Sequence, residues 1–488
     1  MSITKATEYN LVIIGAGAAG FTAAYEAANQ GLTKILLVEK GRHTGGSGDY
    51  IEGAFAVNSK LQQEKNVDIK PEEVVSEELD YSHYEADVKT WQQYVAASGE
   101  MIDWLGDLGA EYIDVKPLGS GKRTWHLFKG LGKEVLHGVF EPKVQELGVE
   151  IITSVSAQSL KKDDNGRITG VVLESESDHS TTEIATKAVI IATGGYLNNK
   201  ELIDKETGYD SERLIPVNSG KNTGDGLKLA WEAGARKYRM GMAMLFGGYL
   251  KDPLTPSFVY RYSQLNGTAA EQSLLWVNES GQRFVNEEVV DNFAYAGNAL
   301  FTQGRTFSII DQNAIDHLMN DGLQRPMSTW HTDLTKLTDL QQNLDEALEK
   351  GLPYIHKADT LEELAEMIET PDLVNTVRKY NTFADQGVDQ DFGKQDKYLL
   401  KVDKAPYYAL ELGVGAFCTM GGLKVNLKNE VIDTKGQAIP GLYAAGNDAA
   451  GNLIGDTYGP NMPGTEAGYS FYSGKHSADC ALEYLKKV

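Results

Sequence analysis

The sequence predicts an α/β fold, and three observations support this prediction. Residues 10–15 form an apolar run typical of a buried strand, and a glycine-rich turn leads from it into residues 21–30, which have the composition of a helix. Residues 34–38 form a second strand run, and residues 189–196 form another strand that ends in a glycine turn. The chain has 488 residues, so we expect two or three lobes rather than a single hydrophobic core.

The composition excludes several classes of function. The chain has 46 basic and 69 acidic residues, and its formal net charge of −23 argues against a nucleic-acid partner because phosphate groups repel a negative surface. The sequence has no apolar run of about 18 residues, so no membrane span is predicted. The two cysteines, Cys418 and Cys480, cannot form a disulfide framework or a thiolate metal cluster. With no apolar signal core at the N-terminus, we expect a soluble cytoplasmic protein without a metal site.

The turn after the first strand has the spacing of a dinucleotide-binding motif. Gly15 permits a tight turn, Gly17 lets the backbone approach a pyrophosphate, and Gly20 lets the helix pack closely against the strand. The helix N-terminus would face the phosphate charge, and Glu39, at the end of the second strand, would bind ribose hydroxyls. The alternative is a glycine turn that binds nothing, but the strand, helix and acid around it favour a nucleotide site.

Further motifs indicate which dinucleotide is bound. A Gly-Gly-Ser-Gly turn follows soon after Glu39, and a strand with a Thr-Gly-Gly end comes much later. These and the remaining motifs occupy residues 45–48, 189–196, 222–230, 276–287, 419–423 and 439–447. In their sequence and order they resemble the flavoprotein superfamily of succinate dehydrogenase and fumarate reductase. The resemblance covers most of the chain.

This resemblance implies a Rossmann-like FAD-binding domain in two pieces, with an α+β clamp domain inserted between them. The FAD-binding pieces would span residues 1–236 and 418–488, and the clamp would span 237–417. Residues 276–287 resemble the hairpin of the clamp domain, and residues 340–385 have a helix-rich composition.

Two local patterns lead to further structural expectations. The strand runs at 148–152, 168–173 and 182–191, with a polar turn at 163–166, predict a small inserted sheet. A stripe of apolar residues at helical spacing predicts plain core packing. The stripe consists of Leu361, Leu364, Met367 and Ile368.

The resemblance also implies that FAD is bound without a covalent link. His43 lies before the Gly-Gly turn rather than at the family's linkage position, so we expect it at the surface. The sequence has no second glycine-rich nucleotide turn and no haem-attachment motif. The residues implied to contact FAD are Gly15, Gly17, Ala18, Ala19, Gly20, Glu39, Lys40, Gly45, Gly46, Ser47, Gly53, Ala54, Ala157, Ala192, Thr193, Gly194, Asp225, Gly446, Asn447, Gly464 and Thr465.

The active-site positions differ from those of the fumarate reductases in this superfamily. In those enzymes hydride passes between flavin N5 and one alkene carbon, an arginine gives a proton to the other carbon, and arginine and histidine hold the carboxylates. The matching positions here are Asp291, Cys418 and Tyr458, and those of the proton relay are Gly267 and Ala270. An acid, a thiol and a phenol cannot neutralise a dicarboxylate, so succinate and fumarate are rejected as substrates.

The loop at residues 455–459 resembles the Gly-x-x-Tyr loop of 3-ketosteroid dehydrogenases in the same superfamily. A phenol can donate to a carbonyl without being charged at neutral pH, so we predict that Tyr458 is the proton donor or carbonyl polariser. Asp291 is the second candidate proton group. The alternatives are a packing or flavin-bonded Tyr458 and an Asp291 that only forms a salt bridge. We interpret Cys418 as a packing residue.

The chain after this loop departs from the ketosteroid dehydrogenase pattern, so a steroid substrate is not implied. Thr465 and Glu466 are expected to open the last helix, whose N-terminal dipole would stabilise a reduced anionic flavin. Six apolar or aromatic residues are candidates for an apolar substrate wall in the clamp or, equally, for the core. They are Tyr249, Tyr260, Tyr262, Met240, Met242 and Met244.

The sequence therefore predicts a FAD-dependent oxidoreductase that acts on a CH–CH bond. Its small-molecule substrate would be an enone or a steroid-like apolar compound rather than a dicarboxylate. One alternative is a hydratase or lyase with non-redox FAD, and another is a non-catalytic flavin carrier. Net hydride transfer would separate these possibilities. NADH, a reduced flavin, a quinone and oxygen all fit the sequence as the electron donor or acceptor.

Overall fold

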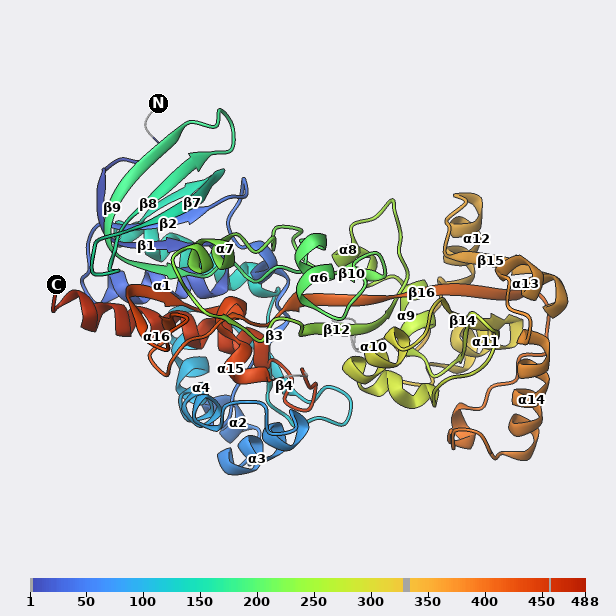
Figure 1. The fold of residues 1–488 in the computed structure, drawn as a ribbon. Helices are drawn as coiled ribbons and strands as arrows, with labels where there is room; N and C mark the ends of the chain where they lie inside the picture. Colours follow the sequence, from blue (N-terminus) through green and yellow to red (C-terminus); the bar gives the residue numbers. More distant parts are fainter. Residues whose placement is uncertain (1–2, 328–333, 456–457) are drawn as a thin grey trace. The chain divides into compact units, whose positions relative to one another are not determined.

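A computed structural model describes residues 3–327, 334–455 and 458–488. The chain forms two compact units (Figure 1). Unit 1 consists of Met1–Gly208, Asn218–Met244 and Cys418–Val488, and unit 2 consists of Tyr209–Val217 and Leu245–Phe417. Within the described residues, each helix is too short or too polar to cross a membrane.

The centre of unit 1 is a largely parallel sheet, which confirms the predicted α/β class. Its strand order is β18-β19-β9-β1-β2-β6, and only β18 is antiparallel to its neighbour along this path. Leu11, Val12 and Ile13 of β1 are fully buried, as in parallel strands covered on both faces. The strands are β1 (Glu8–Ile14), β2 (Ile35–Glu39), β6 (Glu150–Thr153), β7 (Val155–Lys162), β8 (Ile168–Ser175), β9 (Thr181–Ile191), β18 (Glu430–Ile432) and β19 (Ala438–Ala444).

The expected small inserted sheet is wrong in two respects. Strand β6 lies in the main sheet beside β2, and β9 runs from the edge hairpin into the main sheet beside β1. Strand β8 pairs antiparallel with both β9 and β7, and the sequence did not predict β7. Strand β7 contains mainly serine, glutamine and lysine and is exposed at its end, so it lacks the apolar alternation that marks a half-buried strand.

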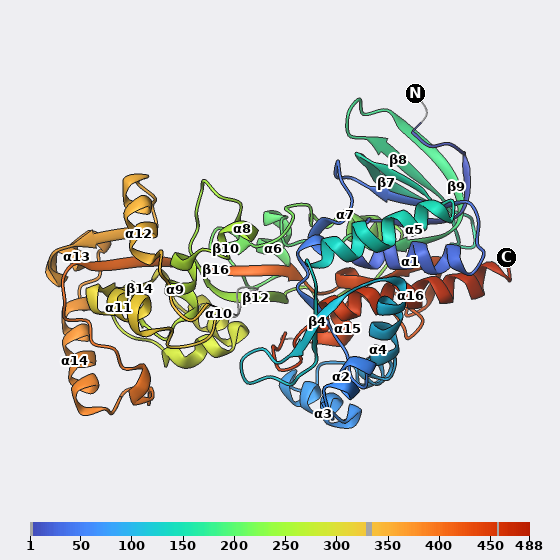
Figure 2. The same ribbon diagram turned by 180° about the vertical axis from the view of Figure 1, so that it is seen from behind.

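The longest helices of unit 1 include the first and the last of the chain. Helix α16 lies beside α1, and a Cβ on Gly474 would fall 2.3 Å from the Ala19 carbonyl oxygen (Figures 1 and 2). Strands β3 (Gly53–Phe55), β5 (Trp125–Phe128) and β4 (Tyr112–Lys116) form a small sheet, and β11 (Lys237–Tyr238) pairs with β17 (Gly422–Leu423). The helices are α1 (Ala18–Asn29), α2 (Lys60–Glu64), α3 (Pro71–Tyr81), α4 (Val88–Leu108), α5 (Glu141–Glu146), α6 (Lys200–Glu206), α7 (Asp225–Glu232), α15 (Gly451–Ile454) and α16 (Thr465–Leu485).

Unit 2 is built around the long strand β16. The sheet order is β10-β16-β14-β13, with β12 and β15 also paired to β16. Its strands are β10 (Leu214–Pro216), β12 (Ala243–Tyr249), β13 (Leu275–Asn278), β14 (Thr306–Asp311), β15 (Ile355–Ala358) and β16 (Tyr407–Thr419). Its helices are α8 (Ser257–Tyr260), α9 (Gln264–Glu271), α10 (Phe293–Phe301), α11 (Gln312–Asp316), α12 (Leu340–Glu349), α13 (Leu361–Ile368) and α14 (Leu373–Gln386).

The expected helices in residues 340–385 are present, and most of the apolar stripe packs as predicted. Leu364 and Ile368 are buried in a core that also contains residues of β13, β14 and α14, and Leu361 packs against it. Met367 is 57% exposed, so its assignment to the core is wrong. Positions 361, 364 and 368 share one helix face, whereas position 367 is rotated away from it.

The expected hairpin at residues 276–287 is also wrong. Strand β13 ends in a turn at Asn278, and its antiparallel partner is β14. Arg283 instead forms two 2.8 Å hydrogen bonds to Glu287 and contacts Asp389 at 2.9 and 3.0 Å. Lys394 completes this buried charge cluster, with its Nζ atom 3.3 Å from Glu287. Residues 283–287 therefore contribute Arg283 and Glu287 to a buried ion-pair cluster inside unit 2.

We expect Arg283→Met to destabilise unit 2 strongly. The change leaves two carboxylates buried without their main partner, which typically costs about 3–5 kcal/mol. A matched control is Arg305→Met, because Arg305 also makes a two-bond pair, with Glu411, but both side chains are partly exposed. That change should cost less than about 1 kcal/mol. Urea unfolding measures both, and equal losses would contradict this account.

Candidate active site

The predicted glycine turn, residues 15–20 of unit 1, forms a close-packed backbone cradle. Side chains at Gly15 or Gly20 would clash with the neighbouring backbone. Gly15 has a φ of +105°, and a Cβ there would fall 2.2 Å from the Ala192 carbonyl oxygen. A Cβ on Gly20 would fall 1.8 Å from the Gly15 carbonyl oxygen, so the helix backbone lies directly against the turn. Gly17 is the N-cap of α1, and no side chain caps the first turn. The amide groups at this helix end are therefore suited to a phosphate.

Glu39 lies where a ribose-binding acid is expected. Its side chain is 7% exposed and accepts hydrogen bonds from the amides of Ala16, at 3.1 Å, and Gly41, at 2.7 Å. These bonds hold the carboxylate beside the glycine turn. The neighbouring Lys40 forms an ion pair with Asp225 and a hydrogen bond with Thr223. Two predicted cofactor residues, Lys40 and Asp225, therefore bind each other.

The structure brings several other predicted cofactor residues together. Gly45 donates its amide to Ala16 at 2.8 Å, and Ser47 bonds to the side chain of Asn222 at 2.9 Å. On β3, Gly53 and Ala54 lie next to Gly464, the N-cap of α16, because a Cβ on Gly464 would touch Ala54 at 2.7 Å. A Cβ on Gly446 would approach Ala19 at 3.3 Å. Ala157 lies apart from these glycine turns, on hairpin strand β7, paired with Leu173.

Asp448 joins the two sequence pieces that carry these residues. Its buried carboxylate accepts hydrogen bonds from the amides of Thr193, Gly194 and Gly195 and from the Thr193 hydroxyl. Burial raises its pKa, and these hydrogen bonds oppose the rise. The sequence prediction missed Asp448, although its position directly after the Gly446-Asn447 turn was an available signal.

These residues fit the FAD that the family implies. The uncapped helix end suits the pyrophosphate, Glu39 suits a ribose, and the buried Asn447 Oδ1 has no hydrogen-bond partner among the described residues. Asn447 would therefore offer a free acceptor to a bound group. FAD, when bound, supplies hydride transfer at N5.

Tyr458 is the predicted catalytic residue, and it is only 3% exposed. Burial raises the pKa of its phenol well above the ordinary value, and the nearby acids Glu466, Cys418 and Glu78 raise it further. The phenol is therefore uncharged over the physiological pH range, as its predicted role as a proton donor requires. Two residues of the predicted loop motif, Asp456 and Thr457, lie outside the described residues.

The groups around Tyr458 include two buried acids, Cys418 and Glu466. Cys418 is 5% exposed, and burial raises the pKa of its thiol well above the usual range, which confirms the interpretation as a buried residue. It lies near the end of β16. Glu466 lies in the first turn of α16, as predicted, and desolvation raises the pKa of its carboxyl. The sequence prediction gave Glu466 no place beside Tyr458.

Tyr94 and Glu78 are two further members that sequence reasoning missed. Tyr94, on α4, is fully buried and donates its hydroxyl to the Thr465 carbonyl at 3.1 Å. Burial raises the pKa of its phenol well above the ordinary value, and the nearby Tyr458 and Glu466 raise it further. Glu78, on α3, is 5% exposed, and burial raises the pKa of its carboxyl to about 8. Both residues come from helices that carry no recognisable motif, so only the folded chain places them here.

Asp291, in unit 2, was interpreted either as a proton group or as a residue that only forms a salt bridge. It does form a salt bridge, with Arg325. Its carboxylate lies 3.0 Å from Arg325, which also contacts Glu288 at 3.4 Å. Its role as a proton group stays a prediction. His43 is exposed, as expected. Tyr249 and Tyr260 are buried, and their hydroxyls bond to the Ser257 carbonyl and to Tyr354, so both have core positions in unit 2.

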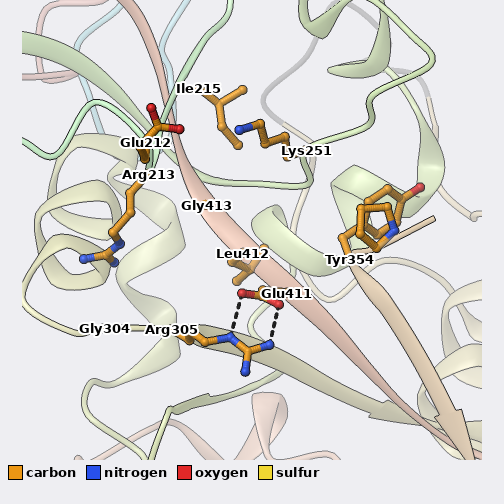
Figure 3. A pocket seen from close by; sticks show the side chains of 11 residues that line it. Glu212, Arg213, Ile215, Lys251, Gly304, Arg305, Tyr354, Glu411, Leu412 and Gly413 are labelled. Carbon is orange, nitrogen blue, oxygen red and sulfur yellow. Dashed lines mark hydrogen bonds and ion pairs between the residues drawn. The ribbon is translucent and has the colours of Figure 1, made fainter. Parts of the chain in front are cut away.

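Unit 2 also contains a cavity of about 490 Å³, shown in Figure 3. Its lining combines the Arg305–Glu411 ion pair with Tyr354 and Leu412. Arg213 also lines it but donates to the carbonyls of residues 300 and 303. None of the predicted site residues lines this cavity, so we do not assign the catalytic reaction to it.

Comparisons with known proteins agree with this description. The FAD binding domain family matches residues 10–456. The chain is 52% identical to a vinyl phenol reductase of Lactiplantibacillus plantarum, over 99% of this chain and 98% of the relative. It is 28% identical to a probable fumarate reductase of Shewanella frigidimarina, over 92% of this chain and 72% of that protein. The structure of a 3-ketosteroid Δ1-dehydrogenase from Sterolibacterium denitrificans has a TM-score of 0.78 at 19% identity, covering 98% of this chain and 100% of that one, and so shares the fold.

We expect Gly20→Ala to impair FAD binding at least ten-fold, or about 1.4 kcal/mol, because the new Cβ pushes α1 away from the turn. The matched control is Gly208→Ala, where the Cβ would meet no atom within 4 Å and φ is not positive. FAD titration followed by protein fluorescence compares the two. If Gly20→Ala binds FAD as tightly as the control, the cradle is not the binding site.

Proposed function

Because the chain belongs to the FAD binding domain family and is a FAD-dependent oxidoreductase of carbon–carbon bonds, we propose that it reduces the vinyl group of a phenol. The buried, uncharged Tyr458 is the observation that carries the choice of substrate class. Such a substrate is neutral, and it needs a proton donor but no cationic groups to hold carboxylates. The similarity to a vinyl phenol reductase over nearly the whole chain supports the same choice.

The proposed reaction adds one hydride and one proton across the vinyl double bond and gives an ethylphenol. Tyr458 donates its hydroxyl proton to the terminal carbon. The para hydroxyl group of the substrate stabilises positive charge at the carbon next to the ring, and that carbon receives the hydride. The raised pKa of Tyr458 keeps its phenol protonated, so the proton is present when the substrate binds.

The same proposal keeps two broader expectations. The reaction consumes two electrons in each turnover, and NADH, a reduced flavin or a quinol would be suited to supply them. The cytoplasmic location stays a prediction. The enone and steroid-like substrates expected from the sequence belong in the same panel of test compounds.

We expect the anaerobically reduced protein to be reoxidised rapidly by 4-vinylphenol and not by fumarate. The flavin absorbance in a stopped-flow instrument measures this directly, and product analysis should find 4-ethylphenol. In this account, Cys418 and Tyr458 stand at the positions where fumarate reductases hold the carboxylates of fumarate with histidine and arginine. Rapid reoxidation by fumarate, with no response to 4-vinylphenol, would overturn the proposed function.

Tyr458→Phe should slow reoxidation by 4-vinylphenol by about 10²–10⁴-fold, because general acid catalysis contributes on this order. FAD binding should be unchanged. The matched control is Tyr443→Phe, which removes a buried hydroxyl from β19 that bonds only weakly, at 3.4 Å, to the Cys480 carbonyl. Equal rates in Tyr458→Phe and in this control would show that Tyr458 is not the proton donor.

A further inference from the structure

His137 connects two acids beside the glycine turn at residues 45–46. It lies on a π-helical segment, Glu134–Phe140, which runs directly into α5. Its Nδ1 atom is 2.7 Å from Oε2 of Glu141, and its Nε2 atom is 2.8 Å from Oδ1 of Asp49. Each ring nitrogen therefore faces a carboxyl group. The proposed reaction uses none of these three side chains, and short π-helical segments are frequent at functional sites.

The two hydrogen bonds of this group need two protons. A carboxylate can only accept a hydrogen bond, and a neutral imidazole carries a single N–H group. The three side chains together must therefore hold one proton more than a neutral ring between two carboxylates. With that proton, both bonds are charge-assisted, and the ring is a clamp between the two acids. The His137 side chain is 37% exposed, so solvent can supply and remove the proton.

Asp49 is the member of the clamp that touches the glycine turn. A Cβ on Gly45 would fall 2.0 to 2.6 Å from the three atoms of the Asp49 carboxyl group, so this group lies directly against the Gly45 backbone. Gly45 and Gly46 have φ angles of +91° and +56°, and the Gly45 amide donates to the Ala16 carbonyl in the cradle at 2.8 Å. The position of Asp49 therefore affects the shape of a turn that is predicted to contact FAD.

The π-helical segment also packs against the residues that follow this turn. A Cβ on Gly48 would fall 2.7 Å from the Leu136 side chain and 3.1 Å from the amide nitrogen of Ala18. The 3₁₀ turn Gly46–Tyr50 is therefore held between the segment that carries His137 and the uncapped end of α1. That helix end is where the pyrophosphate of FAD is expected.

The charges around the ring favour the extra proton. Burial lowers the pKa of His137, but the hydrogen bonds and charges of Glu141 and Asp49 outweigh it and raise the pKa above the ordinary value. Burial raises the pKa of Asp49, and His137 and Lys221 oppose that rise. The other titratable groups on the elements packed around the clamp are Tyr25, Glu26, Tyr50, Glu134, Lys143 and Glu146.

We propose that His137 is a positioning residue for the cofactor, and that its doubly protonated ring holds Asp49 against Gly45 and so keeps the turn in the form that binds FAD. This proposal rests on the predicted contact of Gly45 and Gly46 with FAD and is independent of the reaction that the protein catalyses. When the extra proton leaves, the neutral ring can donate to one carboxylate only. One of the two hydrogen bonds is then lost, and the turn loses its support.

The affinity for FAD should therefore depend on pH. Because the pKa of His137 is raised, the clamp is complete below the ordinary pKa of histidine and is lost as the pH rises through the raised value. The dissociation constant of FAD should rise about five-fold or more between about pH 6 and about pH 9, on the order expected for one hydrogen bond. FAD titration of the apoprotein, followed by protein fluorescence, measures this constant.

Three variants separate the clamp from a general effect of pH. His137→Phe keeps a ring but removes both donors, so it should bind FAD weakly at both pH values. Asp49→Asn should bind tightly at both, because its amide can donate to a neutral His137 that still donates to Glu141. The matched control is His179→Phe, which removes an exposed ring bonded to a single acid, Glu174, at 2.8 Å on the β8–β9 hairpin. It should keep the wild-type pH dependence.

Nitrogen NMR of the histidine-labelled holoprotein observes the extra proton directly. At about pH 6 the signal that is missing from the His137→Phe spectrum should show two protonated ring nitrogens. The proposal is overturned if this ring carries one proton at that pH, or if wild type and Asp49→Asn show the same pH dependence of FAD affinity. The second comparison decides the matter even if His137→Phe does not fold.

Discussion

The hydrogen bonds of Asp448 hold the candidate site together. They tie the turn after β19 to the turn after β9, which lies about 250 residues earlier in the chain. The first piece of unit 1 supplies the glycine cradle and Glu39, and the last piece supplies Asn447, Tyr458 and the start of α16. This carboxylate fixes the two turns against each other, so it positions the segment that follows β19 relative to the one that follows β9.

Unit 1 combines two contrasting environments. The cradle offers backbone amides and an uncapped helix end, which suit the negative charge of a pyrophosphate. Around Tyr458, burial instead raises the pKa of the Tyr458 phenol, the Cys418 thiol and the Glu466 carboxyl, so it favours the neutral form of each. Under the proposed function, this contrast accounts for a site that recognises no carboxylate and still supports hydride chemistry. Reduction of a neutral alkene needs a proton donor, and the protonated Tyr458 phenol can serve as one.

Local sequence predicted the parts of the site that depend on neighbouring residues. The spacing of Gly15, Gly17 and Gly20 is read directly, because a tight turn and a close helix require glycine. Asp448 and Glu78 escaped prediction because their importance arises from burial against segments distant in sequence. Strand β7 escaped for a related reason, since a polar edge strand carries no apolar alternation. Asp291 was read as a proton group or an ion-pair partner, and only the fold shows Arg325 beside it.

The most direct test of this account is a crystal structure of the protein with FAD and 4-ethylphenol. The central claim is that FAD lies in the Gly15–Gly20 cradle and that Tyr458 gives a proton to the terminal carbon of the substrate. The account predicts the Tyr458 hydroxyl within about 3.5 Å of that carbon, since reacting atoms approach to about this distance. Ethylphenol bound beside the flavin with Tyr458 turned away, hydrogen-bonded only to protein, would contradict it.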